Sequence, residues 1–326
     1  MRTPLVTVIL PAKDAGEYIG TTLETLARQF AHADALKLVA IDDGSRDDTG
    51  ALMRQYAERF AHAEVVRNAT ARGLASARNQ GLEHVEGDAF CFLDGDDWMQ
   101  PRRLEVLVSR LRELDCDFLR TDHVAVTGRE RTLVRAPHPW RERVLSPREA
   151  ILPEGETTMV DYPFAWAGVF HRRVIDRGLA HFPPGLFTAE DRPWIWRLHL
   201  QAASFAVVDA PALLYRRGVA TSLTQVRDRR QLDFARAMGQ VIDVVERDHE
   251  AERFLPKVVR TALALSSHHL VRARRMSPQL RAEMRTGIRD MLGRLPADEV
   301  GAVLGRLDGP RRRVLARILR QAGRAT

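Results

Sequence analysis

The sequence contains only two cysteines, Cys91 and Cys116, among 326 residues. This number excludes a disulfide framework and a zinc site with four cysteine ligands, and it is typical of a protein from a reducing compartment. No segment approaches the roughly 18 consecutive apolar residues that a membrane-spanning helix needs. The apolar run at residues 5–10 is too short for a signal peptide. We therefore expect a cytoplasmic protein without a spanning helix.

Lysine is also scarce, with 3 residues against 47 arginines. Because this imbalance is more typical of codon bias than of selection for phosphate contacts, the net charge of +7 is weak evidence for a nucleic-acid partner. The charge is unevenly distributed: residues 226–326 carry 22 basic and 12 acidic side chains, whereas residues 1–225 are slightly acidic. We expect no nucleic-acid partner, because no recognisable nucleic-acid-binding motif accompanies the basic region.

The composition, 45% hydrophobic and 29% charged, is that of a folded globular protein. In the first hundred residues, short apolar runs typical of buried strands alternate with segments of helical period. Strands are expected at residues 5–10, 38–41, 64–67 and 89–93, and helices over 16–30, after Ser45, over 74–84 and over 101–114. This alternation predicts an α/β fold with a mostly parallel sheet and helices on both faces.

The rest of the chain divides into two regions. Residues 115–165 are rich in prolines that mark loops and short strands, and a helix is expected from Pro193 to about Gln201. From Val226 onward the pattern is helical, interrupted by prolines at 256, 278, 296 and 310. We expect an α/β domain of residues 1–225, with halves at 1–100 and 101–225, and a basic helical domain of residues 226–326.

Acidic residues follow three of the expected strands, in the runs Pro11-Ala12-Lys13-Asp14, Asp42-Asp43-Gly44-Ser45 and Asp94-Gly95-Asp96-Asp97. Ligands of parallel α/β sheets bind outside the carboxyl ends of the strands, so we expect these carboxylates to meet at one rim. Oxygen ligands of this kind favour Mg²⁺ or Mn²⁺ over zinc. For each acidic run taken alone, a surface turn that caps the next helix is the alternative.

Two further motifs allow both a functional and a structural interpretation. The segment 73–81 places small residues and Arg78 at the start of a helix, where a diphosphate can bind or where helices pack closely. The pair Glu190-Asp191 precedes a helix that carries Trp194. Its carboxylates suit either helix capping or a general base beside aromatic rings that stack on a sugar.

These motifs, in this order, resemble the family 2 glycosyltransferases with the GT-A fold. The resemblance rests on residues 8–15, 42–45, 73–81 and 92–98, and weaker similarity at 170–173, 182–185 and Glu190-Asp191 extends it to about residue 225. It implies that residues 1–100 bind a nucleotide sugar and that residues 101–225 bind the acceptor.

The resemblance also implies roles for individual residues. Asp191 corresponds to the catalytic base, and Asp96 to the ligand of the Mn²⁺ or Mg²⁺ cofactor. The nucleotide-sugar contacts correspond to Pro11, Ala12, Asp14, Asp42, Arg78, Asp94, Gly95 and Asp96, with Asp42 on the base or ribose and Arg78 near the diphosphate. The acceptor or closing contacts are expected at Glu190, Trp166, Trp194, Arg216 and Arg217.

The implied activity is a metal-dependent, inverting transfer of a sugar from a nucleotide-sugar donor to a hydroxyl group. UDP is the expected nucleotide, and the expected acceptor is a glycan, a polysaccharide of the bacterial envelope or a lipid-linked sugar. A nucleotidyltransferase of similar fold is the first alternative, which the Glu190-Asp191 loop disfavours, and a basic nucleic-acid-binding protein is the second.

The C-terminal segment 311–320 has apolar residues on one helical face and arginines opposite. Three interpretations stay open: peripheral contact with the inner face of an anionic membrane, a homo-oligomer contact, and docking on its own domain.

Overall fold

The computed structural model describes residues 4–219, 228–307 and 309–320, and its centre is a seven-stranded sheet in the order β10-β6-β9-β4-β1-β2-β3. These strands are β1 (Val6–Ala12), β2 (Leu36–Asp42), β3 (His62–Arg67), β4 (Ala89–Phe92), β6 (Phe118–Arg120), β9 (Gly168–His171) and β10 (Phe205–Val207). Only β9 runs antiparallel to its neighbours within this sheet. The mostly parallel α/β sheet expected from the sequence is confirmed.

The burial of the strands explains their sequences. Every residue of β1, β2 and β4 is buried, so these strands are mostly apolar and show no polar alternation, with Thr7, Lys37 and Asp42 as the polar residues. The edge strand β3 is only partly buried, and its sequence is accordingly more polar. The pairing of Ala12 with Asp42, and of Ile9 with Phe92, brings the carboxyl ends of β1, β2 and β4 to one edge.

A second, four-stranded sheet has the order β5-β11-β7-β8. Its strands are β5 (Trp98–Met99), β7 (His123–Thr127), β8 (Glu130–Val134) and β11 (Leu213–Arg216). The sequence did not distinguish this sheet from loops, because β5 has two residues and β11 four, which is too short for a periodic pattern.

The α-helices in the described part of the α/β region are α1 (Ile19–Leu26), α2 (Thr49–Ala57), α3 (Leu74–Leu82), α4 (Arg103–Leu114), α5 (Arg173–Asp176) and α6 (Asp191–Gln201). The leucine spacing of α4 buries Leu104, Leu107 and Leu111, as a helical period requires. Helix α6 begins at Asp191, two residues before the proline at which the sequence predicted its start.

The C-terminal region is helical, as expected. Its helices are α7 (Asp233–Glu246), α8 (Ala251–Arg272), α9 (Pro278–Gly293), α10 (Ala297–Arg306) and α11 (Gly309–Arg320). Pro278 opens α9 behind the capping side chain of Ser277, whereas Pro256 lies inside α8 and does not interrupt it.

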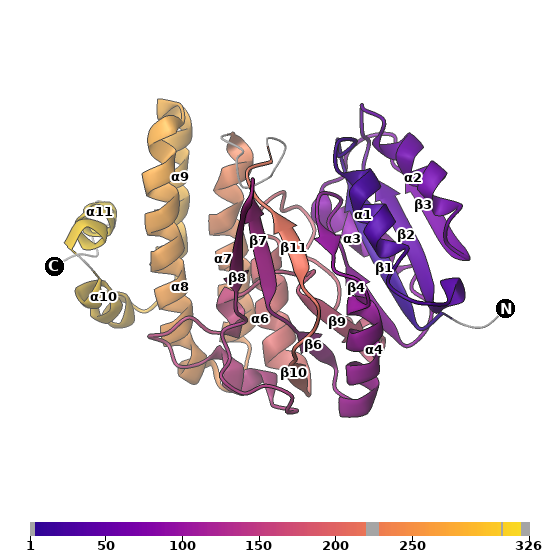
Figure 1. The fold of residues 1–326 in the computed structure, drawn as a ribbon. Coiled ribbons are helices and arrows are strands. Elements are labelled where there is room, and N and C mark those ends of the chain that lie inside the picture. The colour runs from indigo at the N-terminus through magenta and orange to yellow at the C-terminus, as the bar shows by residue number, and fades with distance from the viewer. Residues whose placement is uncertain (1–3, 220–227, 308, 321–326) are drawn as a thin grey trace.

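These helices extend the α/β region away from its N-terminal sheet (Figure 1). Helix α7 packs against α6, and the buried residues of both regions form one continuous hydrophobic cluster. The division into two domains near residue 225 stays a prediction. In the described parts of the chain, no helix combines the length and the apolarity that crossing a membrane requires.

Candidate active site

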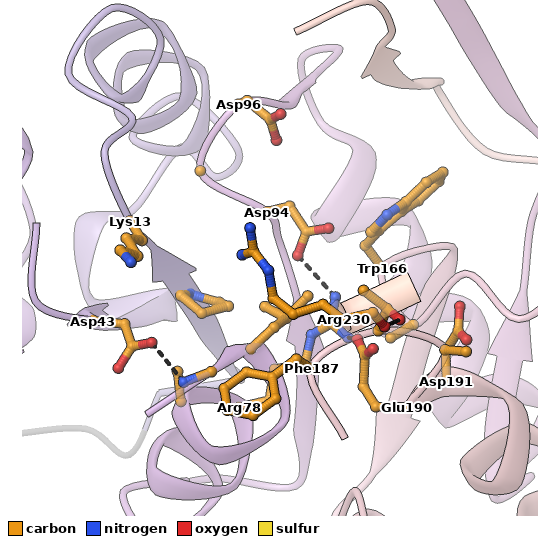
Figure 2. A pocket seen from close by; sticks show the side chains of 18 of the residues that line it. Lys13, Asp43, Arg78, Asp94, Asp96, Trp166, Phe187, Glu190, Asp191 and Arg230 are labelled. Atoms are coloured by element: carbon orange, nitrogen blue, oxygen red, sulfur yellow. Dashed lines mark hydrogen bonds and ion pairs between the residues drawn. The ribbon is translucent and has the colours of Figure 1, made fainter. Parts of the chain in front are cut away.

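A cavity of about 720 Å³ lies at the carboxyl ends of β1, β2 and β4. Figure 2 shows Lys13 and Asp43 on one side of it, Glu190 and Asp191 on the other, and Asp94 and Asp96 between them. The cavity brings together ten of the residues predicted from the sequence: Pro11, Ala12, Asp14, Arg78, Asp94, Gly95, Asp96, Trp166, Glu190 and Asp191. Four predicted residues do not line it: Asp42, Trp194, Arg216 and Arg217.

The loop after β4 carries the two acidic residues nearest the centre of the cavity. Gly95 allows this loop to lie against β1, because a Cβ atom at Gly95 would stand 2.5 Å from the Cβ of Ala12. The amide of Asp97 donates to the carbonyl of Asp94 over 3.1 Å and closes the turn. The carboxylates of Asp94 and Asp96 are thereby left on the cavity side.

Arg216 supports this loop from outside the cavity. Its Nε donates to the carbonyl of Asp96 over 2.9 Å, and its amide donates to Oδ1 of Asp97 over 2.8 Å. Its guanidinium also stacks on Tyr18 and Trp98. Arg217 is exposed and lies over the ring of Tyr215. The prediction of direct contacts from these arginines is therefore not supported by the geometry.

Negative charge is concentrated on the loop. Burial, together with the charge of Asp94, raises the pKa of Asp96 to about 6. Burial and the charge of Asp96 raise the pKa of Asp97 well above its usual range. A cation bound beside Asp96 would relieve this repulsion.

Arg78, on α3, connects the two halves of the cavity. Its Nη2 lies 3.0 Å from Asp94 and its Nη1 lies 3.1 Å from Glu190. Burial opposes the charge of Arg78, but these carboxylates outweigh that effect and hold its pKa above the usual value. Arg78 is therefore a fixed cation beside Asp94 at the centre of the site (Figure 2).

The acidic pair at the start of α6 follows a strained residue, since Ala189 has a φ of +60°. Burial and the charge of Asp191 raise the pKa of Glu190. Burial likewise raises the pKa of Asp191. Glu190 is held by Arg78, whereas Asp191 forms no ion pair with any basic side chain that the structure describes. The two carboxylates of the pair therefore differ in their surroundings, although both line the cavity.

Asp43, rather than Asp42, faces the cavity. Asp43 accepts hydrogen bonds of 2.8 Å from the amides of both Arg72 and Gly73, which hold the loop before α3. Asp42 is fully buried, accepts from the amide of Ser45 and lies 3.2 Å from Arg67. Asp42 therefore does not line the cavity, whereas its neighbour Asp43 does, and the predicted contact with a base or ribose stays a prediction.

Asp14 also has a structural role, because its Oδ1 accepts the amide of Arg46 over 2.8 Å. Its own amide donates to Ser45, so the loops after β1 and β2 hold each other in place. Asp14 still lines the cavity beside Lys13.

Aromatic rings form the wall of the cavity near the acceptor half. Trp166 packs against Phe164 and Tyr215 with ring centroids 4.9 and 5.1 Å apart, and all three line the cavity. Trp194 instead stacks on Phe182 and donates to the carbonyl of Ala180 within the core. Of the two tryptophans predicted to contact the acceptor, only Trp166 reaches the cavity.

The sequence did not predict that the C-terminal helices would close the cavity. Arg230, Gln231, Phe234, Leu265 and His269 all line it. The rings of Phe234 and His269 stack with centroids 3.9 Å apart. Nothing in the helical pattern of this region distinguishes these positions from ordinary core or surface positions.

The donor set of the cavity fits a divalent cation bound partly by a ligand. Asp96 offers carboxylate oxygens and forms no ion pair with the basic side chains that the structure describes. Among the described residues, the one set of three side chains close enough to hold an ion is Asp248, His249 and Glu250, away from the cavity. Arg148 already pairs with two of them, Asp248 and Glu250.

The family model described as "Glycosyl transferase family 2" matches residues 7–178. The chain belongs to this family. EpsJ of Bacillus subtilis, named an uncharacterized glycosyltransferase, is 26% identical over 233 residues, which are 71% of this chain and 66% of EpsJ. The chain therefore spans slightly less than two thirds of that relative.

Solved structures support the fold. The crystal structure of residues 1–349 of S. aureus TarS in complex with UDP-GlcNAc has a TM-score of 0.73 at 19% identity, and the match covers 90% of this chain and 82% of the 1–349 chain. The mannosyltransferase PcManGT from Pyrobaculum calidifontis, solved with GDP-Man and Mn²⁺, has a TM-score of 0.52 at 18% identity, with 99% and 81% covered. The GT-A fold expected from the sequence is confirmed.

Proposed function

We propose that this protein is an inverting glycosyltransferase that moves a sugar from a nucleotide-sugar donor to a hydroxyl group of a glycan or lipid-linked acceptor. One observation carries the proposal: a single cavity joins the Asp94-Gly95-Asp96 loop, the buried Arg78 and the Glu190-Asp191 pair. Family membership and the fold of nucleotide-sugar-bound neighbours support it.

The donor binds at the carboxyl ends of β1 and β2. Pro11 and Ala12, which end β1, and Asp43, which directly follows β2, form the nucleotide end of the cavity. The amino terminus of α3 lies beside them at Gly73, whose φ of +91° bends the chain into the helix. A helix amino terminus and Arg78 both favour the negative charge of a diphosphate. UDP is the proposed nucleotide, since TarS was solved with UDP-GlcNAc.

Asp96 is the residue that would hold the proposed Mn²⁺ or Mg²⁺. When bound, such a cation offsets the charge that accumulates on the leaving diphosphate. We assign one protein carboxylate to the cation, because the other acidic residue of the loop, Asp94, is already paired with Arg78. Asp94 is then free to orient the ribose or the sugar through its remaining oxygen.

Asp191 is the proposed general base. It accepts the proton of the acceptor hydroxyl as that oxygen attacks the anomeric carbon from the face opposite the diphosphate. The carbon–oxygen bond to the diphosphate breaks as the new glycosidic bond forms, which inverts the configuration. A positioned base of this kind contributes about 10² to 10⁴ in rate.

The acceptor binds between Trp166 and the C-terminal helices. The cavity there presents the rings of Trp166, Phe164 and Tyr215. Aromatic faces stack on the apolar faces of sugars, which supports a glycan as acceptor. Glu190 orients Arg78 and completes the connection between the donor and acceptor ends.

The test is product analysis with a panel of nucleotide sugars, Mn²⁺ and glycan acceptors. The proposal requires release of a nucleoside diphosphate together with a sugar of inverted anomeric configuration on the acceptor. Release of inorganic pyrophosphate would instead establish a nucleotidyltransferase. Retention of configuration would exclude Asp191 as the base of a single displacement.

A further inference from the structure

A second cavity, of about 650 Å³, lies among the C-terminal helices α8, α9 and α11 and the turn at Ala273–Arg275. Half of its lining residues are arginines, namely Arg274, Arg281, Arg285, Arg313 and Arg317. The other half are apolar, and neither an acidic nor an aromatic side chain is among the described residues that line it. We call this cavity the arginine groove.

The arginines of the groove lack acidic partners among the residues that the structure describes. None of the five forms an ion pair with an acidic side chain in the described parts of the chain. Other arginines of the C-terminal region are neutralised, as in the pairs Arg229–Glu283 and Arg294–Asp243. The groove therefore concentrates uncompensated positive charge, and the repulsion within it would be relieved by a bound anion.

The packing of α11 places these charges together. Leu315, Ile318 and Leu319 are buried, and α11 packs against α8 and α9. The apolar face of α11 therefore docks on its own chain, which is one of the three interpretations that the sequence left open for residues 311–320. Val271 and Val314 remain 57% and 38% exposed at the groove beside the arginines.

We propose that the arginine groove binds the phosphate headgroups of anionic phospholipids and seats the protein on a negatively charged bilayer. The planar guanidinium forks match phosphate oxygens, and the two exposed valines can enter the boundary between headgroups and acyl chains. A nucleic acid is a poorer match, since the described lining offers apolar side chains where single-stranded bases would need aromatic rings.

Helix α8 connects the groove with the active-site cavity. Its Leu265 and His269 line the active site, while Leu270 and Val271 line the groove. A protein seated by the groove therefore holds its acceptor end close to the bilayer. Seating on the bilayer does not require the proposed activity, so the two proposals can fail separately.

The test is flotation of the full-length protein with phosphatidylcholine vesicles that contain or lack phosphatidylglycerol. We expect binding to the anionic vesicles only, decreasing as salt is added. Because each cation near an anionic surface contributes about fivefold to partitioning, Arg313→Gln/Arg317→Gln should lower the partition coefficient about 30-fold. The control Arg54→Gln/Arg129→Gln removes two exposed charges elsewhere and should change it less than about twofold.

A second variant tests whether the apolar residues of the groove contribute to vesicle binding in addition to its charge. Val271→Ser/Val314→Ser should lower the partition coefficient without changing its salt dependence, and unaltered melting temperatures establish that the variants fold. Equal binding to uncharged vesicles, or an equal loss in the control, would overturn the proposal. Stronger binding to nucleic acid, or complete displacement of the vesicles by inorganic phosphate, would overturn the lipid assignment.

Discussion

Arg78 and Glu190, which come from the two halves of the α/β region, form an ion pair of 3.1 Å inside the active-site cavity. The same guanidinium lies 3.0 Å from Asp94, so one buried cation joins the donor loop and the acidic pair at the start of α6. Asp96 and Asp191 form no ion pair among the described residues, and the other unpaired cavity carboxylates, Asp14 and Asp43, accept backbone amides that hold the neighbouring loops. The predictions below follow from this division of roles.

Asp191→Asn should lower kcat by about 10² to 10⁴, because the acceptor hydroxyl loses its base. The Kd of the nucleotide sugar should stay nearly unchanged, since Asp191 lies at the acceptor end. Initial rates and calorimetry measure the two quantities. Asp176→Asn, at an exposed site outside the cavity, serves as the control, and near-normal turnover in Asp191→Asn would exclude the assigned base.

Substitutions of Asp42 and Asp43 should change different properties, the stability of the protein and its affinity for the nucleotide, respectively. Asp42→Asn removes the buried partner of Arg67 and should lower the free energy of unfolding by about 1 to 3 kcal/mol, with little change in nucleotide affinity. Asp43→Asn should weaken nucleotide binding about tenfold or more, because it alters the loop at Gly73. Urea unfolding and calorimetry distinguish these outcomes, and the reverse pattern would restore Asp42 as the nucleotide contact.

The correct and incorrect sequence predictions have physical causes. The parallel sheet and its acidic edge could be predicted because buried strands and strand-end carboxylates are local patterns. The sequence could not show whether Asp42 or Asp43 faces the cavity, because adjacent residues at a strand end point in different directions. The roles of Trp194 and Arg216 depend on packing between distant segments, which one sequence does not reveal.

Asp96→Ala should remove the dependence of donor binding on the cation. In the wild-type protein, a UDP-sugar should raise the melting temperature more strongly when Mn²⁺ is added, because a tighter ligand stabilises the native state more. In the variant, Mn²⁺ should add nothing. Thermal shift with and without EDTA measures this effect. A variant that still responds to Mn²⁺ would place the cation elsewhere.

In Glu190→Gln, the acid limb of the profile of kcat/KM against pH should shift to lower pH. The base must be unprotonated to act, and burial raises the pKa of Asp191, so kcat/KM falls with decreasing pH earlier than it would for an exposed aspartate. Glu190→Gln removes the carboxylate that pairs with Arg78, so the positive charge of Arg78, which lowers the pKa of Asp191, is less neutralised and the limb shifts to lower pH. A limb that stays in place, or moves upward, would contradict this coupling.

The two tryptophans should differ in what they affect. Trp166→Phe should raise the KM for the acceptor, because Trp166 lines the cavity. Trp194→Phe removes a buried hydrogen bond to Ala180 and part of a stacked core, and should cost about 1 to 3 kcal/mol of stability without changing that KM. Acceptor kinetics and thermal unfolding of both variants provide the comparison.

The central claim, that carboxylates from separate segments hold an activated sugar around one cation, is tested most directly by anomalous diffraction from crystals grown with Mn²⁺ and a UDP-sugar. The account predicts an anomalous peak in the cavity beside Asp96, with the anomeric carbon facing Asp191. A peak confined to the cluster of Asp248, His249 and Glu250, or a sugar bound away from Asp191, would contradict it.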